Sequence, residues 1–216
     1  MEEEPGGERL RGSDYPVHVE VETPVHFERI QLLLRLALAI ALGWVGVTAG
    51  WLVCTLYAAL PVVAAIAISS GGGARYRDEV APRIWHILRW LLQFSAYMAL
   101  LVDRFPTDRD VGVTVMLRPT GTPSIGSALV RLMTSIPSGV VLGILWFISG
   151  ILWVVAAVIV LCGGDMPPSI AKFQRGVLRW SARLVAYHAS LVEEYPPFAF
   201  ETDDGHDTPL AAGSAP

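Results

Sequence analysis

Basic side chains recur at helical spacing near the end of the chain. Arg175, Arg179 and Arg183 follow one another at intervals of four residues within "RGVLRWSARLVAY", a stretch that is otherwise apolar and aromatic. Residues four apart share one face of a helix, and the apolar residues fall on another face. Such a helix is typical of membrane interfaces, where its arginines bind anionic lipid phosphates. We therefore predict that the lipid-headgroup ligands are Arg89, Lys172, Arg175, Arg179 and Arg183.

No other combination of residues predicts chemistry. The five histidines have no metal-ligand spacing, and the sequence contains no phosphate-binding loop, nucleophile elbow or HExxH motif. We expect no catalytic residues, no metal and no cofactor, and therefore a protein that is not an enzyme. The net charge of −4 provides no basic field, so nucleic acid is not an expected partner.

The composition is that of a membrane protein. Of the 216 residues, 53% are hydrophobic and 17% are charged. The acidic start "MEEEPGGER" lacks the apolar core of a signal peptide, so we expect insertion to use internal segments. The two tails, residues 1–14 and 201–216, are rich in acidic residues, glycine and proline, and we expect them to be disordered.

Two long apolar runs, residues 30–68 and 128–162, each contain a single arginine. Because one membrane span needs about 20 residues, the runs predict transmembrane helical hairpins over residues 30–69 and 127–163. The second turn is expected at Ser149 and Gly150, between Trp146 and Trp153. The alternative for this shorter run is a re-entrant hairpin that turns inside the bilayer.

The arginines of these runs, Arg35 and Arg131, have two interpretations. They are either ligands for an anion or lipid inside the membrane, or side chains that snorkel along the helix to the interface. We favour snorkelling. Small residues four apart also suggest close helix packing, which we assign to Gly46, Gly50, Gly139 and Gly143.

The two halves of the chain resemble each other. At an offset of 96, "VHVEV" at 17–21 aligns with "VTVML" at 113–117 and Arg35 aligns with Arg131; at an offset of 90, "LRW" at 88–90 aligns with "LRW" at 178–180. We predict two membrane repeats, residues 15–107 and 108–200, with LRW helices at 82–103 and 170–194. The alternating valines predict short strands that pair with each other or with "FAF" at 198–200.

Basic residues flank both hairpins, whereas the predicted turns carry no charge. The positive-inside rule then places the turns outside and both termini in the cytoplasm. The predicted fold class is an all-α integral membrane protein with two parallel tandem repeats. Each repeat contains a transmembrane helical hairpin and an interfacial amphipathic helix, and the repeats add short surface β-strands.

Several segments resemble one family. "YPVHVEVETP", "LRW", "AY" and "EEYPPF" are similar to the bacterial membrane-protein family known as domain of unknown function 4389, over roughly residues 15–200 as two tandem copies. The first copy departs from the pattern with "RFPT" in place of "YPPF". The resemblance implies a bacterial inner-membrane protein and no assigned activity.

We therefore expect a multi-pass protein of the bacterial inner membrane that acts as a non-enzymatic accessory or scaffold subunit. Its expected partners are anionic membrane lipids and either another membrane protein or further copies of itself. The alternative is a small transporter or channel, with an anion path between the repeats lined by Arg35, Arg89, Arg131 and Arg179.

Overall fold

The computed structural model describes residues 15–24, 27–44, 49–107, 112–163 and 165–197. The tails predicted to be disordered and the "FAF" segment lie outside these residues. The described chain is mostly helical. Its elements in order are β1 (Val17–Val21), α1 (Arg29–Trp44), α2 (Ala49–Arg75), the π-helical turn η1 (Tyr76–Val80), α3 (Ala81–Met98), β2 (Val113–Leu117), α4 (Ile125–Leu161) and α5 (Pro168–His188).

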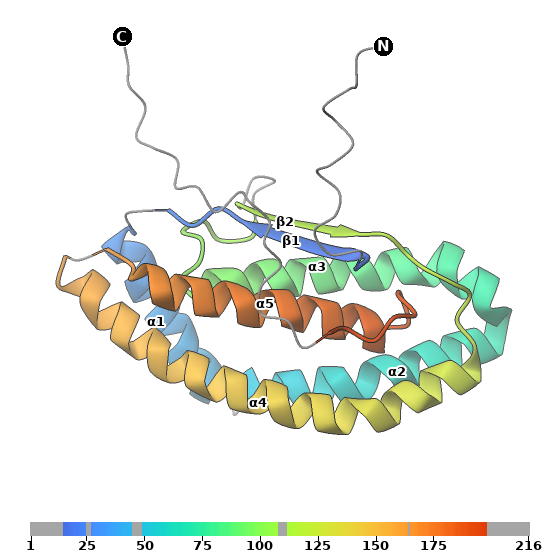
Figure 1. Cartoon of the computed structure of the whole chain (residues 1–216). Coiled ribbons are helices and arrows are strands. Elements are labelled where there is room, and N and C mark those ends of the chain that lie inside the picture. Colours follow the sequence, from blue (N-terminus) through green and yellow to red (C-terminus); the bar gives the residue numbers. More distant parts are fainter. Residues whose placement is uncertain (1–14, 25–26, 45–48, 108–111, 164, 198–216) are drawn as a thin grey trace, which may run out of the picture.

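The elements form three layers, shown in Figure 1. The two strands make one outer layer, α3 and α5 lie beneath them, and α1, α2 and α4 make the opposite layer. The middle layer is therefore covered on both sides, which explains why most of α5 is buried.

The strands pair antiparallel at the predicted positions, with Val19 opposite Val115. Their alternation places Val19 and Val115 in the core and leaves Glu20 and Thr114 exposed, as expected for a sheet with one buried face. α5 packs beneath β1 and α3 packs beneath β2. Each strand thus covers the helix that belongs to the other half of the chain.

The predicted second hairpin is wrong, because α4 is one helix of 37 residues. At Ser149, where the turn was expected, α4 stays helical and is hydrogen-bonded to α5. The Ser149 hydroxyl donates to the Gln174 side-chain oxygen, and Gln174 Nε2 donates to the Ser149 carbonyl at 3.0 Å. Trp146 and Trp153, which bracket the expected turn, have buried indole nitrogens. Packing on α5 therefore overrides the local turn signal of Ser149 and Gly150.

The predicted first hairpin is wrong in its packing. α1 and α2 are separate helices, but they lie one after the other along α4 and do not fold back on each other. Leu32 of α1 clusters with Ala156 and Val160 near the end of α4. At the other end of α4, Gly73 of α2 meets the backbone of Pro123. The outer helical layer is therefore an antiparallel pair, α1 and α2 on one side and α4 on the other.

The prediction that α5 lies in the membrane interface with one lipid-exposed face is also wrong. From Val177 to His188 every residue of α5 is buried, because the helix packs against α4 on one side and β1 on the other. Its cationic face contacts protein. An amphipathic pattern does not distinguish a lipid surface from a polar protein surface.

Candidate functional site

The outer layer of helices carries a large apolar surface. Among the described residues, the exposed large apolar side chains outside α1, α2 and α4 are Ile87, Trp90, Met116 and Tyr195. We call the exposed large apolar side chains of α1, α2 and α4 the outer face. It consists of Ile30, Leu33, Leu34, Leu36 and Ile40 of α1, Val62, Val63 and Ile66 of α2, and Ile125, Leu129, Val130, Met133, Ile136, Val140, Ile144, Phe147, Ile148, Ile151, Val154, Val155, Val158 and Leu161 of α4. Apolar surfaces of this extent mark contact with a membrane or a protein partner.

The charges of the outer helices do not interrupt this face. Arg29 and Arg75 stand at the ends of α1 and α2. The two internal cations, Arg35 of α1 and Arg131 of α4, are 0% and 3% exposed. Both turn toward the middle layer, so the snorkelling prediction is wrong.

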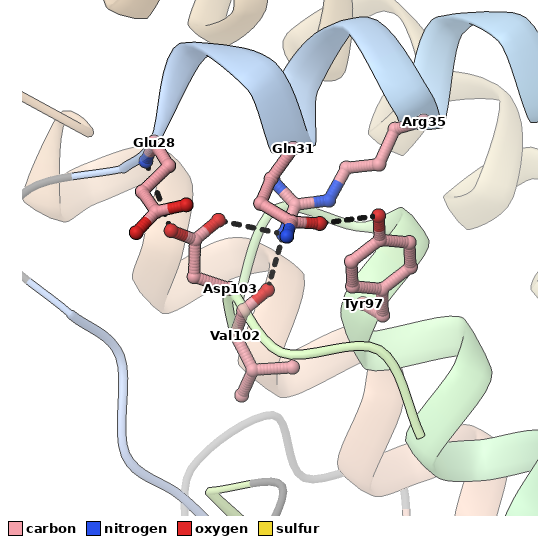
Figure 2. A network of polar contacts seen from close by, with 6 residues as sticks. All are labelled: Glu28, Gln31, Arg35, Tyr97, Val102 and Asp103. Atoms are coloured by element: carbon pink, nitrogen blue, oxygen red, sulfur yellow. Dashed lines mark hydrogen bonds and ion pairs between the residues drawn. The ribbon is translucent and has the colours of Figure 1, made fainter. Parts of the chain in front are cut away.

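Arg35 lies in a polar network that joins α1 to the segment after α3 (Figure 2). Its Nη2 donates to the Val102 carbonyl at 2.5 Å and to Asp103 Oδ1 at 3.1 Å. Its guanidinium carbon lies 4.3 Å from the centre of the Tyr97 ring, an attractive cation–π arrangement. Tyr97 donates in turn to Gln31 Oε1 at 3.0 Å. A buried cation needs such partners, since burial of an unpaired charge is costly.

Arg131 occupies a similar position in the second half. Its Nη1 donates to the Tyr187 carbonyl at 3.1 Å, and its guanidinium carbon lies 4.8 Å from the centre of the Tyr187 ring. The alignment of the two halves equates Arg35 with Arg131 and Tyr97 with Tyr187. An arginine on an inward-facing tyrosine therefore fastens each outer helix to the middle layer.

The arginines of α5 bind the N-terminal strand segment. Arg175 Nη1 donates to Thr23 Oγ1 at 3.1 Å, and Arg179 Nε donates to the Val19 carbonyl at 3.1 Å. Arg183 stacks at 5.5 Å over the ring of Tyr15. Because the Val19 carbonyl lies on the edge of β1 away from β2, Arg179 also occupies an open strand edge.

These contacts decide part of the headgroup prediction. Arg179 and Arg183 are 9% and 3% exposed, so the prediction that they bind lipid phosphates is wrong. Arg175 is half-buried beside Thr23. Arg89 and Lys172 are exposed, and their lipid contact stays a prediction.

The predicted packing glycines do not make close helix contacts where the structure describes them. A Cβ atom at Gly139 or Gly143 would meet nothing within 4 Å, so neither glycine packs closely against another helix of this chain. Gly46 and the surroundings of Gly50 lie outside the described residues. The glycine that does permit close approach is Gly73, where a Cβ atom would lie 2.3 Å from the Pro123 carbonyl oxygen. The glycine-rich sequence "SSGGGAR" at 69–75 gives no local signal of this contact.

The second half of the chain is similar to a described family. Residues 126–199 match the family model described as a domain of unknown function (DUF4389). No curated protein and no solved structure matches the chain. This single match contains α4 except its first residue, all of α5, and both Arg131 and Tyr187.

Two helical segments are long and apolar enough to cross a membrane, Thr55–Met98 with 44 residues and Ile136–Leu161 with 26. By length and composition, they are consistent with membrane association. They do not establish a multi-pass topology.

The histidine behind the outer layer, His188, has a lowered pKa. His188 is fully buried at the end of α5, where its Nδ1–H donates to the Leu184 carbonyl at 2.7 Å and its ring packs on Tyr57. Burial, reinforced by the nearby charge of Arg131, lowers the pKa of His188 to about 4. Within the described residues, no group of three or more His, Cys, Asp and Glu side chains is placed to hold a metal ion.

Proposed function

We propose that this protein is a membrane-embedded, non-enzymatic scaffold or accessory subunit of a bacterial inner-membrane complex. The observation that carries the proposal is the outer face, an apolar surface along the full length of α4 with no exposed charge between its ends. Water does not stabilise such a surface, whereas lipid or a membrane partner does.

Two tandem copies of the family unit are part of this proposal. The support is geometric. Val19 pairs with Val115 at the centre of the sheet, and these residues are equivalent at the offset of 96. Arg35 stacks on Tyr97 as Arg131 stacks on Tyr187. A duplicated unit related by an internal twofold axis accounts for both sets of contacts.

The proposal assigns different tasks to the two sides of the molecule. The outer face contacts the membrane. The opposite side, formed by the sheet with exposed Glu20, faces the cytoplasm, as do both termini. A polar surface held at a fixed height above the membrane suits a subunit that positions other proteins.

The first experiment tests membrane embedding. We expect the tagged full chain, expressed in bacterial cells, to remain in membranes washed with alkaline carbonate. A charge on the outer face, Ile144→Lys, should shift the chain toward the wash, whereas Thr114→Lys on the exposed side of the sheet should not. Complete release of the unmodified chain by carbonate would contradict the proposal.

The second experiment tests the scaffold role. The chain is crosslinked in intact cells, extracted in several mild detergents, and identified with its partners by mass spectrometry. We expect one partner, or a further copy of the chain, at constant stoichiometry in every detergent, and a weaker yield after a charge reversal at Glu20 on the sheet. A chain that is monomeric and alone in all detergents would contradict the scaffold role.

A further inference from the structure

We propose that the outer face lies in the plane of the membrane and is immersed in a single anionic leaflet, so that α4 runs parallel to the surface and does not cross the bilayer. This inference rests on the proposed membrane association and names its geometry. It replaces the four spans predicted from the sequence with an in-plane helical pair.

The length of the outer face is the first argument. Its exposed apolar side chains begin at Ile125 and end at Leu161, the first and last residues of α4. A helix of 37 residues is about 55 Å long at 1.5 Å per residue. The hydrocarbon core is about 30 Å thick. An upright α4 would leave nearly half of this apolar surface in water, whereas a flat α4 immerses all of it.

The position of the other layers is the second argument. α5 packs along α4, and β1 packs on α5, so the sheet lies beside the outer layer and not beyond its ends. If α4 crossed the membrane, the exposed side of the sheet with Glu20 would stand at the depth of the hydrocarbon. Burying an uncompensated carboxylate there is prohibitive. With α4 flat, the sheet faces water.

Charge distribution is the third argument, and it favours an anionic leaflet. Within the bounds given above, the five α-helices contain ten basic residues and no acidic residue. The basic residues are Arg29, Arg35, Arg75, Arg83, Arg89, Arg131, Lys172, Arg175, Arg179 and Arg183. The acidic residues that the structure describes lie in η1, the strands and the loops. The exposed basic residues among them, such as Arg29 at the start of α1, would be complemented by the headgroups of an anionic leaflet.

The depth of nitroxide labels along α4 tests this geometry. In a background with Cys54→Ser and Cys162→Ser, single labels are placed at Met133→Cys, Ile144→Cys and Val155→Cys. These positions are 11 residues apart on one helical face, and each is exposed. The full chain is reconstituted in vesicles that contain anionic phosphatidylglycerol, and depth is read from relaxation by oxygen and by a water-soluble nickel chelate. Thr114→Cys on the sheet serves as the water-exposed control.

We expect the three labels to lie at one common depth, about 5–10 Å below the phosphates, as for in-plane helices. A spanning α4 would change the depth by about 16 Å from one label to the next, and this gradient would overturn the in-plane geometry while leaving membrane association intact. Labels hidden from both reagents and coupled between chains would show that a second copy covers the face. Three water-exposed labels on a chain that does not stay with the vesicles would refute membrane association itself.

Discussion

Arg35 of α1 and Asp103, which follows α3, form an interior ion pair in which Nη2 lies 3.1 Å from Oδ1. The second carboxylate oxygen of Asp103 accepts the backbone N–H of Glu28 at 2.9 Å, at the start of α1. One carboxylate therefore holds both the N-terminus of this helix and its internal cation. As a result, the cation points away from the outer face, which stays uncharged.

Removal of this carboxylate should destabilise the fold. Asp103→Asn leaves Arg35 buried without its counter-charge, and breaking a buried ion pair in this way costs about 3–5 kcal/mol. Because Asp103 is 17% exposed, we expect a loss toward the lower end of that range. Thermal unfolding in a mild detergent measures it. The matched control is Glu79→Gln, which breaks the exposed pair with Arg75 and should change stability by less than about 1 kcal/mol. Equal effects of the two variants would contradict the account of Arg35.

Arg179 should matter for stability and not for lipid binding. Arg179→Met keeps the apolar part of the side chain but removes the donor to the Val19 carbonyl, and a hydrogen bond with a charged partner contributes about 1.5–3 kcal/mol. Arg89, the aligned position in the first half, is exposed, so Arg89→Met should change stability by about 0.5 kcal/mol or less. Unfolding and the anionic lipid that co-purifies are measured for both variants. A loss of bound lipid with unchanged stability in the Arg179 variant would restore the interfacial interpretation of α5.

Stability should depend on pH through His188. Its pKa is about 4 in the folded protein and about 6.5 when unfolded, so the unfolded state takes up the proton first as the pH falls. The contribution of neutral His188 to the free energy of unfolding is therefore fully present above pH 6.5. It is lost between pH 6.5 and 4, by up to about 3 kcal/mol. His188→Met introduces the residue found at the aligned position Met98 and should flatten the unfolding profile over this range. An unchanged slope in that variant would assign the pH dependence to other groups.

Two glycines should respond oppositely to alanine. In Gly73→Ala the new Cβ would lie 2.3 Å from the Pro123 carbonyl oxygen, a backbone atom that cannot move aside, and overpacking of this kind costs about 1–3 kcal/mol. In Gly139→Ala the Cβ meets nothing, and alanine favours the helix by up to about 1 kcal/mol. Unfolding midpoints give both values. A destabilised Gly139 variant would mean that α4 packs closely against another helix there.

The sequence allowed accurate prediction of features that depend on local patterns. The alternating valines located β1 and β2, and the offset of 96 equated Val19 with Val115, which the structure places opposite each other. The apolar runs correctly identified helices of the outer layer. These patterns depend on period and length, which are written directly in the chain.

The errors concern what each surface contacts. The spacing of the α5 arginines fits a helix that binds lipid and equally fits a helix that lies under a strand. Only the position of Tyr15, Val19 and Thr23 above α5 distinguishes these two interpretations. The turn expected at Ser149 is absent, because Gln174, 25 residues later, hydrogen-bonds to Ser149 while α4 continues as a helix. Such long-range partners have no local signal.

The most direct test of the central claim is acyl-chain photolabelling of the unmodified protein. The chain is reconstituted in anionic vesicles that contain a lipid with a photoreactive group at mid-chain, and labelled peptides are identified by mass spectrometry. The account predicts labels on the outer face, for example at Met133, Ile144 and Val155, and none on the α5 residues Arg179 and Arg183. Labelling of α5, or no labelling of α4 above the background of a soluble protein, would contradict it.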